Sequence, residues 1–156
     1  MYPACVLLKE PEKVIVCETD ERRISFVREH YPQALVFDPQ SEDPESFVRS
    51  HTRHRGADVV LEVAGTEKTF EMAWKCARPN AIVTIVALYD RPQTLPLPGM
   101  YGKNLTFKTG GVDGCDCDAI LKLIGEGKID TTPLITHTYP LEKLKKLNEL
   151  LKLKVI

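Results

Sequence analysis

The sequence predicts an α/β fold in which helices cover both faces of a doubly wound parallel sheet. Short runs of valine, isoleucine, leucine and alanine alternate with amphipathic stretches of ten or more residues, which is typical of repeated βαβ units. The apolar runs are nearly continuous, as strands buried on both faces require. With 156 residues, of which 43% are hydrophobic, the chain is long enough to bury one core, and we expect residues 1–156 to form a single domain.

The expected strands are short and β-branched. The clearest segments are 13–17, 34–37, 58–63 and 81–88, and the weaker ones are 104–109 and 134–138. The sequence between them predicts helices at 20–30, 43–51, 66–77, 116–125 and 140–152. Asp43 followed by Pro44 suits the N-cap and first position of a helix. Phe70, Trp74 and Ala77 share one face of the third helix, which predicts that this face is buried. The proline-rich stretch 91–99 is expected to be a loop.

The stretch KVIVCETDERR, residues 13–23, is a short apolar strand that stops on an acid and turns into a helix. In nucleotide-binding α/β folds, an acid at such a strand end accepts the ribose hydroxyls, and a glycine-rich loop about 20 residues upstream holds the pyrophosphate. Only seventeen residues precede Glu18, and none is glycine. The local pattern therefore leaves two interpretations open: a ribose acceptor, or a solvated acid that stabilises the positive end of the helix dipole.

Composition excludes several other classes of protein. Lysine and arginine total 21 against 22 acids, so the net charge of −1 favours neither nucleic acid nor an anionic membrane as a partner. The five cysteines include no C-x-x-C pair and are expected to be reduced thiols of a cytoplasmic protein. The N-terminal apolar run is too short for a signal sequence or a membrane span. GCDCD, 114–118, lacks the spacing and the second pair of a zinc site, so no metal site is expected.

Three longer phrases carry a family resemblance. They are GADVVLEVAGTEKTFEMAWKCARPNAIVTIVALYDRPQTLPLP at 56–98, KNLTFKTGGVDG at 103–114 and GKIDTTPLITHTYPLEKL at 127–144. Their order and spacing resemble the C-terminal, coenzyme-binding domain of the medium-chain, zinc-containing alcohol dehydrogenase family, over about residues 12–150. The resemblance implies a Rossmann-like domain of six parallel strands with the ancestry of an NAD-linked oxidoreductase acting on an alcohol or polyol.

The resemblance also implies cofactor-binding residues. Glu18 corresponds to the acid that binds the adenosine ribose, so NAD is expected in preference to NADP because a 2′-phosphate would be repelled. Arg23 corresponds to a basic position beside the adenosine, with an ion pair to Asp20 or Glu21 as the alternative. The turn under the ribose and nicotinamide corresponds to Val63, Ala64 and Gly65, and the backbone at the carboxamide end corresponds to Val86, Ala87 and Leu88.

The sequence departs from the family at its start. VLLKEPEKVIVCE, 6–18, resembles the tail of the family's first helix running into its second strand, without the first strand, the glycine-rich turn or the zinc-binding catalytic domain. From this incomplete domain we expect no catalytic residue, no zinc bound by this chain, and NAD binding that is weak or vestigial. Activity is then absent, or depends on a chain carrying the missing half.

Loss of the first strand would leave two unpaired strand edges. Three outcomes are open: the flanking strands pair directly, a second copy or another chain fills the gap, or the chain does not fold stably. The alternative function is a non-catalytic oligomerisation module, in which strand edges and the leucine-rich last helix bind a partner.

Overall fold

A computed structural model of the protein describes residues 2–110 and 116–144, and the chain forms two compact units. The central unit is Pro11–Cys115, and the terminal unit combines Met1–Glu10 with Asp116–Ile156. All strands among the described residues belong to the central unit. The residues predicted to bind a cofactor also lie there, so the site is built within one unit.

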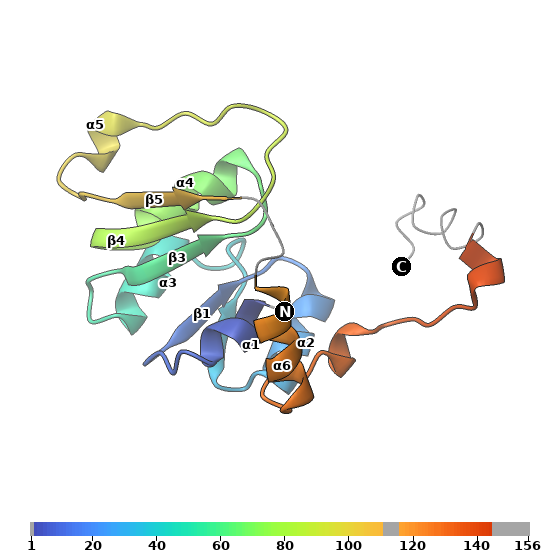
Figure 1. The fold of residues 1–156 in the computed structure, drawn as a ribbon. Coiled ribbons are helices and arrows are strands. Elements are labelled where there is room, and N and C mark those ends of the chain that lie inside the picture. Colours follow the sequence, from blue (N-terminus) through green and yellow to red (C-terminus); the bar gives the residue numbers. More distant parts are fainter. Residues whose placement is uncertain (1, 111–115, 145–156) are drawn as a thin grey trace. The chain divides into compact units, whose positions relative to one another are not determined.

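The described strands form two parallel sheets in the central unit (Figure 1). The first sheet pairs β1 (Val14–Cys17) with β2 (Ala34–Phe37), and the second has the order β3 (Ala57–Glu62), β4 (Ala77–Ile85), β5 (Thr106–Thr109). Every pair is parallel and the strands alternate with helices, which confirms the predicted α/β class. The boundaries of β1 and β2 agree with prediction to within one residue.

The strands β1 and β3 lie in separate sheets. Of the three outcomes open from the sequence, direct pairing of the strands that flank the missing one is therefore not the arrangement adopted. The side chains of Val59, Leu61 and Val63, which share one side of the β3 segment, are exposed. This strand was expected to be buried on both faces, and it is covered on one only.

Three helices of the central unit begin where the sequence predicts, because each has a side-chain cap. Asp20 caps α2 (Glu21–His30), Asp43 caps α3 (Pro44–His51) with Pro44 at its first position, and Thr66 caps α4 (Glu67–Cys76). In α4 the cap is reciprocal, since the Thr69 hydroxyl also bonds the Thr66 backbone. The short helix α5 (Leu97–Met100) lies in the segment expected to be a loop.

The strand β4 begins four residues before its predicted start. Ala57 pairs with Ala77, whereas Val59 pairs with Ile82, so β4 carries an irregularity that the apolar pattern does not reveal. Asn80 takes a positive φ of 60° there. The ion pair between Arg78 and Asp58 joins the two strands beside this point.

The core of the second sheet is made of small residues. Ala73, Ala77, Ala81 and Val83 are buried together, and the partly buried side chains packed on them are Val60, Ile85, Leu105 and Phe107. Phe70, Trp74 and Ala77 are buried, which confirms the face predicted for α4. The ammonium of Lys103 donates to the main-chain carbonyls of Trp74, Lys75 and Ala77 at 3.0, 2.7 and 2.9 Å, and so stabilises the C-terminal end of α4.

The terminal unit contains helices only among its described residues: α1 (Tyr2–Leu7), α6 (Cys117–Gly125) and the 3₁₀ helices η1 (Thr132–Leu134) and η2 (Leu141–Lys143). The helix α1 agrees with the expected helix tail. The strand predicted at 134–138 is wrong: η1 occupies its start, and Ile135 is exposed and pairs with none of the strands that the structure describes. The last predicted helix begins as η2, and residues 145–156 lie outside the described part. No helix in the described ranges is long and apolar enough to span a bilayer.

Candidate functional site

The predicted cofactor-binding residues follow the carboxyl ends of three parallel strands. Glu18 follows β1, residues 63–65 follow β3, and residues 86–88 follow β4. In open α/β sheets, ligands bind outside the carboxyl ends of the strands. The two turns of the second sheet are in direct contact, since the main-chain carbonyl of Glu62 accepts hydrogen bonds from the amides of Val86 (2.8 Å) and Ala87 (3.2 Å).

Glu18 is held in place by its own loop. Its Oε1 accepts hydrogen bonds from the amides of Thr19 (2.7 Å) and Asp20 (3.0 Å) and from Nη2 of Arg23 (3.0 Å). Its Oε2 lies 2.9 Å from Nε of Arg23. The Glu18 side chain is 22% exposed and that of Arg23 is 68% exposed. The carboxylate is therefore a fixed acceptor at the strand end rather than a freely solvated acid.

Arg23 has a different partner from those considered in the sequence analysis. Asp20 is occupied as the N-cap of α2, where its carboxylate accepts the amides of Arg22 (3.0 Å) and Arg23 (3.1 Å). The hydrogen bond from the Arg23 amide is the main reason why the pKa of Asp20 lies below its usual value. The Arg23 guanidinium turns to Glu18 instead, so the two residues predicted at the adenosine end form one pair.

Glu62 is the central acid of the site, and the sequence analysis did not single it out. The residue is only 3% exposed. Its Oε1 accepts from the amides of Ala64 and Gly65, both at 3.0 Å, and its Oε2 accepts from the Tyr89 hydroxyl at 2.5 Å. The signal that could have found it is the acid inside the apolar run VVLEVAG, since a buried carboxylate needs several donors.

The charge state of Glu62 follows from these bonds. Burial opposes ionisation, but the hydroxyls of Tyr89 and Thr69 and the amides of Gly65 and Ala64 outweigh it and lower the pKa of Glu62. The pKa of Tyr89 is raised by burial and by the Glu62 carboxylate. A glutamate anion accepting from a neutral tyrosine is therefore the stable state of the pair at neutral pH.

Gly65 lies where a side chain would not fit. Its φ is +75°, and a Cβ at this position would come within 2.6 Å of the main-chain oxygen of Leu88. Glycine is required both by the left-handed backbone and by the close approach of the two turns. The predicted residues 63–65 and 86–88 thus pack against each other.

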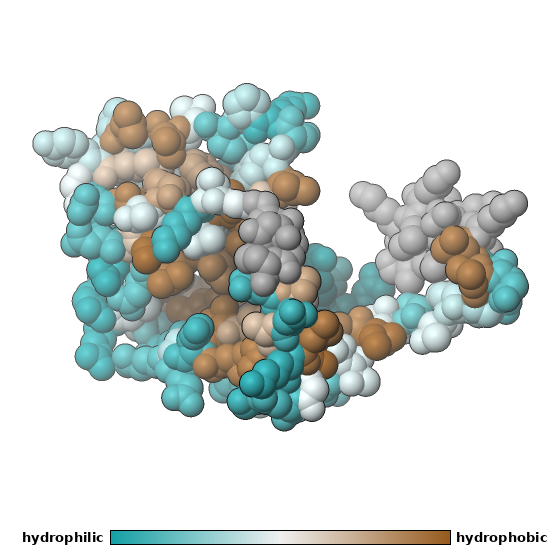
Figure 2. Space-filling model, in the orientation of Figure 1, coloured by the Kyte–Doolittle hydropathy of each residue, from teal (hydrophilic) through white to brown (hydrophobic). Residues whose placement is uncertain are grey.

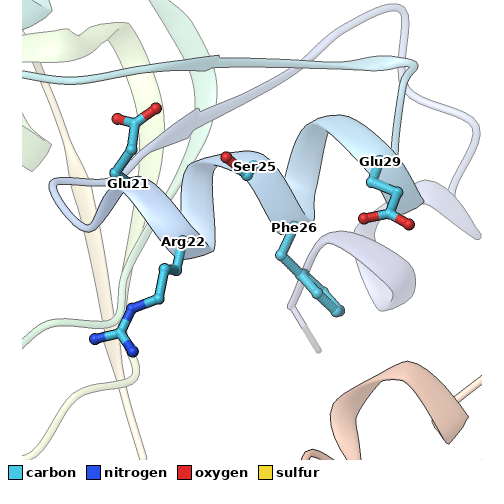
Figure 3. Close-up of a pocket in the computed structure, with 5 residues that line it drawn as sticks. All are labelled: Glu21, Arg22, Ser25, Phe26 and Glu29. Carbon is cyan, nitrogen blue, oxygen red and sulfur yellow. The ribbon is translucent and has the colours of Figure 1, made fainter.

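A hollow of about 520 Å³ opens beside these turns. Its lining is contributed by the turn after β3, the start of α4 and the loop after β4: Gly65, Thr66, Glu67, Leu88, Asp90, Arg91, Pro92, Gln93 and Thr94. Leu88 is 94% exposed at its rim. A second hollow of about 350 Å³ lies along the outer face of α2, where Figure 3 shows Glu21, Arg22, Ser25, Phe26 and Glu29 on successive turns of the helix. It contains none of the predicted cofactor residues.

Within the described ranges, no group of three histidine, cysteine, aspartate or glutamate side chains converges as a metal site. Cys115, one of the two thiols of GCDCD, lies outside those ranges. Cys117 is exposed at the start of α6.

Comparison with known proteins identifies a family. The zinc-binding dehydrogenase family model matches residues 7–124. The chain is 30% identical over 142 residues to (R,R)-butanediol dehydrogenase of Neisseria gonorrhoeae, covering 90% of this chain and 40% of that protein. It is 32% identical over 144 residues to L-threonine 3-dehydrogenase of Symbiobacterium thermophilum, covering 90% and 41%.

Solved structures show the same fold. The alcohol dehydrogenase TADH from Thermus sp. ATN1 superimposes with a TM-score of 0.88 at 27% identity, over 97% of this chain and 44% of that one. The chain therefore matches a Rossmann-like domain of the alcohol dehydrogenases and spans about two fifths of the length of these relatives.

Proposed function

The chain belongs to the zinc-binding dehydrogenase family, and from this premise we propose that its central unit is an NAD-binding element with a partial dinucleotide site. Glu18 accepts the adenosine ribose hydroxyls, with Arg23 beside it. The turn 63–65 lies under the ribose and nicotinamide, and the backbone of 86–88 contacts the carboxamide end. NAD is the cofactor, and it binds weakly.

One observation carries this proposal: Glu62 and Gly65 hold the turns after β3 and β4 in direct contact with each other. A dinucleotide spans several strand ends, so its binding surface needs adjacent turns with fixed positions. A loop that merely connects a strand to a helix has no need of a buried carboxylate that binds two amides and a phenol.

The residues present fit such a cofactor. Glu18 offers its carboxylate at a strand end, where an acid accepts from ribose hydroxyl groups. Val63 and Leu88 present exposed apolar side chains and Ala64 an exposed small one, which suits the flat faces of a ribose and a nicotinamide ring. The cofactor supplies hydride chemistry when bound, and these residues bind and orient it.

The ion pair of Glu18 supports NAD rather than NADP. A 2′-phosphate would place two negative charges near a carboxylate whose oxygens are already oriented by two amides. Arg23 carries one positive charge and is already ion-paired with Glu18, so it offsets this repulsion only in part.

We propose that oxidoreductase activity on an alcohol or polyol requires polypeptide that residues 1–156 do not contain. The relatives whose names record such substrates are more than twice as long as the part that matches this chain. In that arrangement the central unit supplies ribose and nicotinamide contacts, and a chain carrying the other half supplies the zinc-binding residues.

A second candidate function is a homo-oligomerisation module without catalysis. It is favoured by large apolar side chains that remain exposed between β4 and β5: Leu88, Leu95 and Leu97, with Tyr101 92% exposed. Figure 2 shows hydrophobic surface over α5, in which Leu97 lies. Burial of such apolar side chains against a second copy of the chain would favour association.

Thermal unfolding followed by Trp74 fluorescence separates the two functions. Trp74 is the only tryptophan and is buried on α4. A melting temperature that increases with millimolar NAD⁺ supports the cofactor site, because a ligand that binds only the folded state raises the melting temperature. A melting temperature that is unchanged by NAD⁺ but increases with protein concentration supports the oligomerisation module.

A further inference from the structure

The residue before the turn 63–65 makes contacts that a strand residue does not need. Glu62 ends β3, and both its main chain and its side chain reach beyond the strand. Its carbonyl oxygen accepts the amides of Val86 and Ala87, while its carboxylate accepts those of Ala64 and Gly65. One residue therefore binds two amides of each turn.

Tyr89 closes this arrangement from the other side. Its hydroxyl donates to Oε2 of Glu62 at 2.5 Å across 27 residues of sequence. Its ring packs edge-on against Phe70 of α4, with centroids 6.4 Å apart. The residue after 86–88 is thus anchored both to the acid of β3 and to the helix that follows β3.

We propose that Glu62 and Tyr89 are positioning residues, which join the turns 63–65 and 86–88 into one cofactor-facing surface. The inference rests on the proposed function for its consequence, but the joining itself is a property of the folded chain. Glu62 does not touch the cofactor in this account; it acts through the amides that it binds.

The network is expected to hold the two turns rigidly together. Glu62 is buried, so its hydrogen bonds are not exchanged with water, and an unmade bond there costs more than one at the surface. The main-chain oxygen of Leu88 lies close enough to Gly65 to exclude even a methyl group. A shift of either turn therefore requires a shift of the other.

The consequence for binding is a split between the two ends of the dinucleotide. The adenosine end meets Glu18 and Arg23, whose contacts do not include Glu62 or Tyr89. The nicotinamide end meets the joined turns. Loosening the network is expected to weaken the binding of NAD⁺. The binding of AMP, which has only the adenosine end, should be unchanged.

The test uses Tyr89→Phe, which removes the cross-turn hydroxyl and keeps the ring. Tyr101→Phe is the matched control, since Tyr101 is 92% exposed. The first readout is amide hydrogen exchange without nucleotide. We expect faster exchange at Ala64 and Gly65 in Tyr89→Phe only; an effect confined to residues 86–90 would overturn the joining.

The second readout is the dissociation constant of each nucleotide. Tyr89→Phe is expected to raise the dissociation constant of NAD⁺ about tenfold, which corresponds to about 1.4 kcal/mol, and to leave the dissociation constant of AMP unchanged. Equal weakening of both would overturn the positioning role. If the unmodified protein binds neither nucleotide while the exchange result holds, the proposed function fails and the joining of the turns stands.

Glu62→Gln provides a second variant. The amide keeps one acceptor oxygen for Ala64 and Gly65 and offers an N–H to the Tyr89 oxygen, so it preserves the shape of the network at lower strength. We expect exchange at Ala64 and Gly65 to rise in this variant as well. Exchange identical to that of the unmodified protein would contradict a role for the carboxylate.

Discussion

The guanidinium of Arg23 holds the carboxylate of Glu18 at two points, with Nη2 3.0 Å from Oε1 and Nε 2.9 Å from Oε2. Two neighbouring amides complete the shell of Oε1, so this oxygen is already saturated. Oε2 has fewer partners, and we infer that a ribose hydroxyl approaches it. The pair thus presets the acceptor and leaves one oxygen for a ligand.

Glu18→Ala is expected to weaken NAD⁺ binding by about tenfold or more, because a hydrogen bond to a charged group contributes about 1.5–3 kcal/mol. It should also reduce the difference in affinity between NAD⁺ and NADP⁺, because the negative charge that repels the 2′-phosphate is removed. Dissociation constants for both nucleotides measure this. Glu21→Ala, in the first turn of α2, is the control with the same loss of charge. Tighter binding of NADP⁺ than NAD⁺ by the unmodified protein would contradict the role of Glu18.

Gly65→Ala is expected to destabilise the protein by about 2 to 4 kcal/mol, from a left-handed backbone and from the clash with the Leu88 oxygen. Gly102→Ala is the matched control: its φ is +84°, and nothing lies within 4 Å of the added carbon. The control should cost about 1 kcal/mol. Urea unfolding measures both, and equal losses would mean that the two turns do not approach as closely as described.

Lys103→Met is expected to lower the free energy of unfolding by about 2 kcal/mol. The ammonium bonds three carbonyls at the end of α4, and methionine keeps the apolar stem while removing those donors. Burial lowers the pKa of Lys103. Lys108→Met, at an exposed position of β5, is the control. Equal melting temperatures for the two variants would contradict the stabilising role of Lys103 at the end of α4.

The lowered pKa of Glu62 predicts that the stability of the protein depends on pH. Its pKa in the folded protein is lowered below 4.5, so as the pH falls the unfolded chain takes up the proton first. Its contribution is therefore present above pH 4.5 and is lost as the pH falls through the lowered pKa. Unfolding measured between pH 3 and 7 should show a shallower loss for Glu62→Gln than for the unmodified protein. A steeper loss in the variant would contradict the sign.

The thiols are expected to differ in reactivity. Burial raises the pKa of Cys76 to about 12, and the charge of Glu45 adds to the effect. Cys5 and Cys117 are exposed. Since the thiolate is the reactive form, Cys76 should react with a disulfide reagent at pH 8 only after unfolding. Mass-spectrometric mapping of the labelled peptides measures this, and rapid labelling of Cys76 in the folded protein would contradict its burial.

The sequence predicts local structure well where side chains decide it locally. The start of α3 follows from Asp43 and Pro44 alone, and the cap bond from the Ser46 amide to Asp43 is observed. The strand predicted at 134–138 fails because a strand also needs a neighbour, which an apolar run cannot guarantee. The division into two sheets depends in the same way on pairing at a distance.

The contacts among the predicted site residues follow from the sequence only in part. Glu18 stands out because it ends a strand, whereas the turns 63–65 and 86–88 were predicted from the family resemblance. The structure does bring these two turns together. The partner of Arg23 was not predicted, because Asp20 is nearer in sequence but is occupied by the amides of α2. Glu62 and Tyr89 are 27 residues apart, and their bond is evident only once β3 and β4 lie side by side.

The most direct test of the NAD site is a map of amide chemical shifts during titration of the ¹⁵N-labelled protein with NAD⁺. We predict that the shifts gather at Glu18, at residues 63–65 and at residues 86–88, and leave the outer face of α2 at Ser25, Phe26 and Glu29 unchanged. Saturable shifts elsewhere, or none at millimolar NAD⁺, would contradict the assignment of these strand ends as a dinucleotide site.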